Sequence, residues 1–205
     1  MFTGIVTAVG QIRETRKTGD LRAVITCPFD PAGIAMGASI ACSGVCLTVV
    51  DKGGVAGDAW FAVDISAESV ARTVPGRWEQ GTSLNLEPAL KLGDELGGHI
   101  VTGHVDGVGK IVSVTPEGDS RRFVIEASAD LAPFIAPKGS ITVDGISLTV
   151  NDVTDQPGGT CHFALNIIPH TAQVTTIGAA KAGDSVNLEI DVLARYLKRM
   201  QSLRG

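Results

Sequence analysis

The sequence predicts an all-β protein made of two tandem six-stranded antiparallel barrels and a C-terminal α-helix. Short runs rich in Val, Ile and Thr dominate the chain, and Gly, Pro, Asp or Asn bound each run. The whole pattern of runs occurs twice, about 100 residues apart, a period that corresponds to a domain and not to a solenoid repeat. After the second copy, the apolar residues change to helical spacing.

The duplication can be followed residue by residue. The matching pairs of segments are Thr3–Val6 and Thr102–Val105, Ser39–Val49 and Ser140–Val150, Phe61–Ile65 and Phe163–Ile167, and Gly81–Glu87 and Gly183–Glu189. Two similar domains indicate two similar ligand sites. We therefore expect a protein that holds two copies of one molecule against each other.

Each copy is expected to contain six strands. In the first copy they lie at residues 4–13, 21–27, 39–42, 45–51, 59–65 and 83–88. In the second copy they lie at residues 102–114, 122–127, 140–143, 146–153, 161–167 and 185–190. Short strands joined by short turns are best closed into a small barrel, because closure leaves few exposed edges.

Helical turns are expected between the fifth and sixth strands, at residues 68–73 and 170–175. Asp30 and Asp130 are each placed to cap a shorter helical turn. The C-terminal helix is amphipathic, and its apolar residues are Ile190, Leu193, Tyr196, Leu197 and Met200. This face packs either on the second barrel or on partner subunits, and the pattern leaves both open.

A turn-rich linker over residues 90–98 separates the two copies. We therefore expect an N-terminal barrel over residues 1–97, a C-terminal barrel over residues 98–190 and a helical element over residues 191–205.

The composition excludes several classes of partner. The net charge of −5 argues against binding to nucleic acid or to an anionic membrane surface. Every apolar stretch is shorter than the roughly 18 residues of a membrane span. The N-terminus begins with a strand-like segment and not with a signal peptide. The four cysteines form no CxxC pair, so a reducing cytoplasm is the expected location.

Two equivalent positions carry nucleophile-capable side chains. Cys46 and Ser147 each follow a Gly-Val or Gly-Ile pair and stand two residues before Thr48 and Thr149, which places them on the same strand face as these threonines. A buried cysteine is most often a small hydrophobic residue. The serine at the equivalent position instead favours a polar ligand.

The histidines and the other polar differences indicate two related pockets with different roles. His104 takes the place of Ile5. Placing a polar, titratable side chain on a barrel strand costs free energy, so a histidine there suggests a function. The further differences between the copies are Asp64 to Asn166, Ser66 to Ile168, Glu68 to His170 and Ser43 to Asp144. His99 and His104 have no metal-ligand spacing, and the chain contains neither GxGxxG nor a P-loop. No metal and no cofactor are expected.

These segments resemble the riboflavin synthases of the alpha-chain type. The likeness includes Met1–Val6, Gly44–Thr48, Gly97–His99, Thr102–Val105 and Asp144–Thr149, and it extends to about Asp191. It implies Greek-key barrels, a helix that trimerises the chain, and cofactor-free transfer of a four-carbon unit between two molecules of 6,7-dimethyl-8-ribityllumazine. The products are riboflavin and 5-amino-6-(D-ribitylamino)uracil, and the active site lies between the N-terminal barrel of one subunit and the C-terminal barrel of another.

The resemblance also implies site residues. The catalytic candidates are Cys46, Ser39, His104, Ser147 and Thr149. The first lumazine pocket would use Gly4, Ile5, Val6, Ser39, Cys46, Leu47, Thr48, Asp64, Ile65, Ser66, Ala67, Glu68 and Ser69. The second would use Gly103, His104, Val105, Lys138, Ser147, Leu148, Thr149, Asn166, Ile167, Ile168, Pro169, His170 and Thr171.

Two other functions compete with this interpretation. A non-catalytic lumazine- or flavin-binding protein needs only one working pocket, whereas here both threonines remain together with Cys46, Ser147 and His104. A barrel module of a flavoprotein reductase would need a nucleotide-binding partner domain, and the chain has none. The enzyme is therefore favoured.

Overall fold

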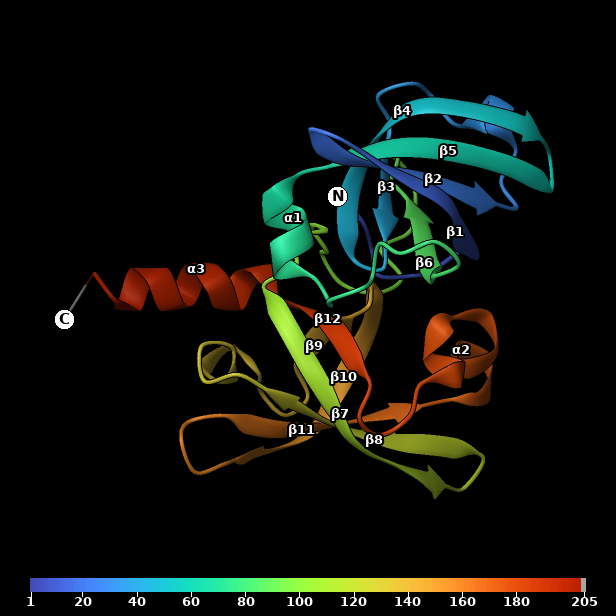
Figure 1. Ribbon diagram of the computed structural model, residues 1–205. Coiled ribbons are helices and arrows are strands. Elements are labelled where there is room, and N and C mark those ends of the chain that lie inside the picture. Colours follow the sequence, from blue (N-terminus) through green and yellow to red (C-terminus); the bar gives the residue numbers. More distant parts are fainter. Residues whose placement is uncertain (204–205) are drawn as a thin grey trace.

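Each half of the chain forms a closed six-stranded antiparallel barrel in the computed structural model, which describes residues 1–203. The two barrels lie one above the other in Figure 1, and a C-terminal helix projects from the side of the pair. The predicted fold class is confirmed. No helix in the described part of the chain is long and apolar enough to span a membrane.

The first barrel contains β1 to β6 and the short helices η1 and α1. Their bounds are β1 Ala8–Thr18, β2 Asp20–Cys27, η1 Pro31–Gly33, β3 Ser39–Cys42, β4 Val45–Val55, β5 Asp58–Ile65, α1 Ala67–Arg72 and β6 Ser83–Pro88. The strands follow the order β1-β2-β5-β4-β3-β6 around the barrel. Strands β3, β4 and β5 are consecutive neighbours, and β2 lies beside β5, which is the Greek-key arrangement.

The second barrel repeats this arrangement. Its bounds are β7 Gly107–Glu117, β8 Ser120–Ala127, η2 Ala132–Phe134, β9 Ser140–Val143, β10 Ile146–Asp155, β11 Cys161–Ile167, α2 Pro169–Val174, η3 Thr176–Ala179 and β12 Ser185–Ile190. The bulges are repeated too: β1 and β7 shift register after Ile12 and Ile111, and β4 and β10 after Val49 and Val150.

Alternating side chains fill the two barrels. Ile12, Ile25, Phe61 and Leu84 are at most 1% exposed in the first core. Their counterparts in the second core, Ile111, Ile125, Phe163 and Val186, are at most 2% exposed. Because strand side chains alternate between faces, the residues between them face outward, where a ligand can reach them.

Several expected boundaries were wrong. The first strand of each barrel begins at Ala8 or Gly107 and not at residues 4 or 102, because the residues before it leave their own barrel. Asp30 caps η1, as predicted, by accepting a hydrogen bond from the backbone of Ala32. Asp130 caps nothing, because the second copy has one more residue before its helical turn and Leu131 takes the N-cap position.

The barrels meet through equivalent hairpin turns between β3 and β4 and between β9 and β10. Ser43 and Asp144 have φ of 45°, and each precedes a glycine with positive φ, as two-residue hairpins require. A Cβ on Gly145 would lie 2.7 Å from the backbone nitrogen of Gly44. The two turns therefore pack backbone to backbone, and only glycine allows this approach.

Reciprocal hydrogen bonds fix the two barrels to each other. The Asn85 side chain donates to the Asp144 carbonyl at 2.8 Å, and the Asn187 side chain donates to the Ser43 carbonyl at 2.9 Å. Phe2 and Val101 exchange backbone hydrogen bonds and are both 1% exposed. The duplicated halves are therefore related by an approximate twofold arrangement.

The C-terminal helix α3, Val192–Gln201, extends away from both barrels in Figure 1. Asp191 caps it, and Arg195 makes two hydrogen bonds to Asp106 at 2.7 and 3.0 Å. Its apolar side chains are more than half exposed at Leu193, Tyr196, Leu197 and Met200. Ile190, which was expected on this face, instead ends β12 and is 4% exposed in the second core. The second barrel leaves the other four side chains largely uncovered.

Candidate active site

The outer faces of the duplicated hairpins carry the candidate side chains. Ser39 is opposite Thr48, and Ala41 is opposite Cys46, in the β3–β4 register. Leu47, between Cys46 and Thr48, points into the core and is 4% exposed. The outward residues of β3 and β4 therefore form one surface, on which the half-buried Cys46 thiol lies next to the Ser39–Thr48 pair.

The second barrel has the same surface with different side chains. Ser140 is opposite Thr149, and Thr142 is opposite Ser147, in the β9–β10 register. A serine thus replaces Cys46, and a threonine replaces Ala41. These substitutions put more hydroxyl groups on the second surface than on the first.

The segments that precede the barrels are exchanged between them. The Cys46 backbone donates to the carbonyl of Gly103 at 2.8 Å, and the Ser147 backbone donates to the carbonyl of Gly4 at 2.8 Å. Val105 packs against the first core, and Val6 packs against the second. Each surface is therefore covered by the leading segment of the other half of the chain.

The exchange groups the predicted pocket residues differently from the two sets expected from the sequence. Gly4 and Val6 contact the second barrel, and Gly103 and Val105 contact the first, although the Gly4 and Gly103 backbones also donate to Glu87 and Glu189 of their own barrels. A Cβ on Gly4 would lie 2.5 Å from that of Ser147, and one on Gly103 would lie 2.7 Å from that of Cys46. The glycines let the backbone pass directly over these side chains.

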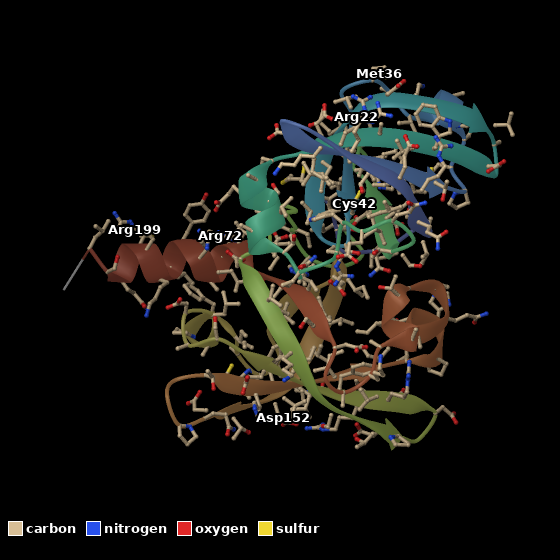
Figure 2. All side chains as sticks on the ribbon, viewed as in Figure 1. Arg22, Met36, Cys42, Arg72, Asp152 and Arg199 are labelled. Carbon is tan, nitrogen blue, oxygen red and sulfur yellow. The ribbon has the colours of Figure 1, made fainter. Side chains whose placement is uncertain are left out.

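A cavity of about 240 Å³ opens beside Cys46. It is lined by Val45, Cys46, Glu68, Ser69, Arg72, Thr73, Gly103, His104 and Val105. Ser66 caps α1 by accepting a hydrogen bond from the backbone of Ser69, and Arg72 pairs with Glu68 at 2.7 Å. The structure thus brings together Cys46, the start of α1 and the segment that contains His104. Figure 2 labels Arg72 on α1 and shows how side chains fill the space between the barrels.

Other predicted residues surround this cavity without lining it. Asp64 is exposed at the end of β5, where Arg22 lies 3.7 Å from its carboxylate. Ser66 and Ala67 are exposed at the start of α1. The side chain of Ile65 is fully buried in the core, so any contact that it or Leu47 makes with a ligand involves its backbone.

The predicted residues of the second barrel occupy equivalent places. Asn166 lies one residue before the end of β11, as Asp64 does in β5. Ile168 is the N-cap of α2, and Pro169, His170 and Thr171 form its first turn. Thr149 is exposed, Leu148 is half-buried, and Ile167 is 1% exposed. Lys138 has φ of 66° and replaces Gly37, which has φ of 80°. A lysine in this conformation is strained, and such strain is concentrated at functional sites.

His99, which was not among the predicted site residues, lies beside Ser147. Its Nδ1 lies 2.7 Å from the Ser147 hydroxyl, and its Nε2 lies 3.2 Å from the Thr142 hydroxyl. Burial lowers the pKa of His99, and the charge of Asp191 opposes this effect. The neutral ring can accept a proton from Ser147 through Nδ1 while Nε2 donates to Thr142. His99 precedes Thr102, where the repeated segments of the second copy begin, so the comparison of the two copies gave no signal for it.

The buried carboxylates of Glu87 and Glu189 were also not among the predicted site residues. Glu87 accepts hydrogen bonds from the backbone of Thr3 and Gly4, and Glu189 accepts them from the backbone of Thr102, Gly103 and His104. Burial raises the pKa of both carboxyl groups, against the effect of these hydrogen bonds. The repeated Asn-Leu-Glu sequence was the available signal, but it was interpreted only as evidence of duplication.

Comparison with known proteins places the chain in a family. The model of the lumazine binding domain matches residues 3–89 and again residues 102–191. A riboflavin synthase of Brucella abortus is 49% identical over 98% of both chains, and one of Mycobacterium tuberculosis is 43% identical over the full length of both. The chain belongs to the riboflavin synthase family.

Solved structures agree with this membership. LumP with bound riboflavin has a TM-score of 0.76 and 27% identity, and the match covers 93% of this chain and 99% of that one. LumP with bound 6,7-dimethyl-8-(1'-D-ribityl) lumazine has a TM-score of 0.74 and 25% identity over the same shares. The riboflavin synthase family therefore shares its double barrel with a protein that binds lumazine and flavin.

Proposed function

We propose that this chain converts two molecules of 6,7-dimethyl-8-ribityllumazine into riboflavin and 5-amino-6-(D-ribitylamino)uracil by transfer of a four-carbon unit. The observation that supports this function is the pair of equivalent surfaces around Cys46 and Ser147, each covered by the other half of the chain. Each barrel, with its boundary near residue 97, is one lumazine-binding unit.

The reaction needs a base for one substrate and an added nucleophile for the other. The 7-methyl group of the donor is acidic, because its carbanion is delocalised into the ring system. The acceptor is activated by addition at its C7. Holding both rings together removes much of the entropic cost of a bimolecular step. Side chains of this chain are sufficient for these tasks, so we expect no metal or redox cofactor.

The different surroundings of Cys46 and Ser147 support a division of roles. Cys46 borders the cavity beside α1, so we assign addition at C7 of the acceptor to the first barrel. In the second barrel, Ser147 is hydrogen-bonded to a half-buried His99 whose pKa is lowered. This arrangement suits removal of a proton from the donor. Thr149 lies on the same strand face as Ser147, and Lys138 donates a backbone hydrogen bond to the carbonyl of Val150 on the same strand.

The two surfaces of one chain do not face each other. Helix α1, which borders the first cavity, and α2, which begins at the equivalent residues of the second barrel, lie on opposite sides of the molecule in Figure 1. Two lumazine rings bound to one chain would therefore not stack. We propose that the first barrel of one subunit meets the second barrel of another in a homotrimer, with α3 at the subunit interface. We place this trimer in the cytoplasm, where the four free cysteines stay reduced.

The test uses purified protein after exhaustive dialysis against a chelator. With 6,7-dimethyl-8-ribityllumazine as the only added compound, riboflavin absorbance and fluorescence should appear, and one riboflavin should form for every two lumazines consumed. Tight binding of lumazine without riboflavin formation would identify a non-catalytic binding protein. Activity that returns only with added zinc or flavin would contradict the expectation that no cofactor is needed.

A further inference from the structure

The buried carboxylates Glu87 and Glu189 connect each barrel to the site on the other. Glu189 accepts from the Thr102 backbone at 2.7 Å, the Thr102 hydroxyl at 2.6 Å, the Gly103 backbone at 3.0 Å and the His104 backbone at 3.1 Å. Four donors satisfy one carboxylate that is 2% exposed. These contacts fix Gly103 and His104, which together with Val105 line the cavity beside Cys46.

A continuous line of hydrogen bonds runs from Glu189 to Cys46. The N–H of Gly103 donates to Glu189, and the carbonyl of Gly103 accepts from the N–H of Cys46 at 2.8 Å. Glu189 belongs to β12 of the second barrel, whereas Cys46 belongs to β4 of the first. The carboxylate of one barrel thus sets the position of the thiol on the other.

The same line exists in the opposite direction. Glu87 accepts from the Thr3 backbone at 2.7 Å, the Thr3 hydroxyl at 2.8 Å and the Gly4 backbone at 3.0 Å. The carbonyl of Gly4 then accepts from the N–H of Ser147 at 2.8 Å. Because the copies are equivalent, each carboxylate provides a matched control for the other.

We propose that Glu189 and Glu87 are crossed positioning residues: Glu189 shapes the Cys46 site, and Glu87 shapes the Ser147 site. Each acts through the leading segment that it holds and touches no substrate. The proposal rests on the proposed function for the meaning of the two sites, but the positioning itself can be measured without turnover. A conventional arrangement, in which each barrel builds its own site, would give the opposite dependence.

The first measurement is the rate at which iodoacetamide alkylates Cys46. Cys46 is half-buried, whereas the other three cysteines are buried, so one thiol dominates the reaction. Replacing Glu189 by Gln removes the charge and presents an amide N–H₂ to backbone donors. The segment over Cys46 then opens more often, and we expect alkylation to become about tenfold faster in Glu189→Gln. Glu87→Gln should alkylate at the wild-type rate.

Milder variants keep the test valid if a Gln variant fails to fold. Thr102→Val removes only the hydroxyl donor to Glu189 and should accelerate alkylation by a smaller factor, while Thr3→Val should not. Glu14→Gln removes an exposed acid on β1 and controls for the change in net charge. Melting temperatures of all five variants separate local opening from global loss of stability.

Kinetics with 6,7-dimethyl-8-ribityllumazine give the second measurement. Glu189→Gln and Glu87→Gln should both lower kcat, but only Glu189→Gln should also change Cys46 alkylation. Equal alkylation rates in the two variants, or acceleration by Glu87→Gln alone, would overturn the crossed positioning. Wild-type protein that alkylates as described but forms no riboflavin would contradict the proposed function and leave the positioning intact.

Discussion

At the residue scale, the two sites differ in what surrounds their nucleophile-capable side chain. Cys46 borders a cavity of about 240 Å³, whereas Ser147 is hydrogen-bonded to His99 at 2.7 Å. We expect Cys46→Ser to lower kcat about tenfold or more while lumazine affinity changes much less, because contacts made in the transition state are lost. Steady-state kinetics and fluorescence titration measure the two effects. As a control, Cys27→Ala should lower the melting temperature without changing kcat, since Cys27 lies in the core. An unimpaired Cys46→Ser enzyme would remove the nucleophilic role.

His99 gives a prediction about pH. Burial lowers its pKa from the ordinary value of 6.5, so the unfolded chain binds the proton more readily than the folded one. Its contribution to stability is complete above pH 6.5 and is lost as the pH falls from there toward the lowered pKa. Activity should fall only at the acid end of this window, as the pH passes through the lowered pKa, because the folded ring then becomes protonated and cannot accept a proton from Ser147. His99→Gln should lower kcat and abolish this acid limb in the pH profile, whereas His162→Gln on β11 should keep it. An unchanged profile in His99→Gln would exclude His99 as the group responsible.

At the element scale, α3 is the helix that we propose to lie at the subunit interface. Leu193, Tyr196, Leu197 and Met200 are more than half exposed, a surface typical of an interface. Truncation after Asp191 should leave folded monomers with little activity, because the sites are then no longer paired between subunits. Sedimentation velocity and circular dichroism test this expectation. Leu197→Glu should have the same effect, while Lys198→Glu on the same helix should leave the assembly unchanged. A trimer that survives the truncation would require another interface.

The strands and the hairpins could be predicted because their causes are local. Alternating apolar residues and Gly-containing turns specify them. Each pattern also occurs in both copies, so every strand and hairpin is predicted twice. The path of residues 3–6 and 102–105 could not be predicted in the same way. Their β-branched composition suits a strand, but they are bound by the side chains of Glu87 and Glu189 and not by a strand ladder, and those partners are more than 80 residues distant in sequence. The cap at Asp130 failed for a local reason, since one extra residue displaced it.

At the scale of the whole molecule, the exchanged segments make the two barrels depend on each other. Residues 1–97 expressed alone would lack the Gly103–Val105 segment over Cys46 but keep the matching Gly4–Val6 segment. Two copies can then cover each other's site, so we expect a dimer that binds lumazine and forms no riboflavin. Sedimentation together with fluorescence titration checks this result. Gly4→Val should weaken the dimer, because a side chain there collides with the hairpin it crosses. A stable monomer that binds lumazine as tightly as the full chain would show that the exchange is dispensable.

The segment that links the two barrels also makes their two sites different. Two separate, identical barrels that exchanged their leading segments would have identical sites, and neither could specialise as donor or acceptor. Joining them in one chain brings residues of the connecting segment to the second site. His99 is such a residue, since it lies ahead of the second repeat and its Nδ1 is 2.7 Å from the Ser147 hydroxyl. The covalent join that unites the barrels thus also adds to the chemical difference between the two sites.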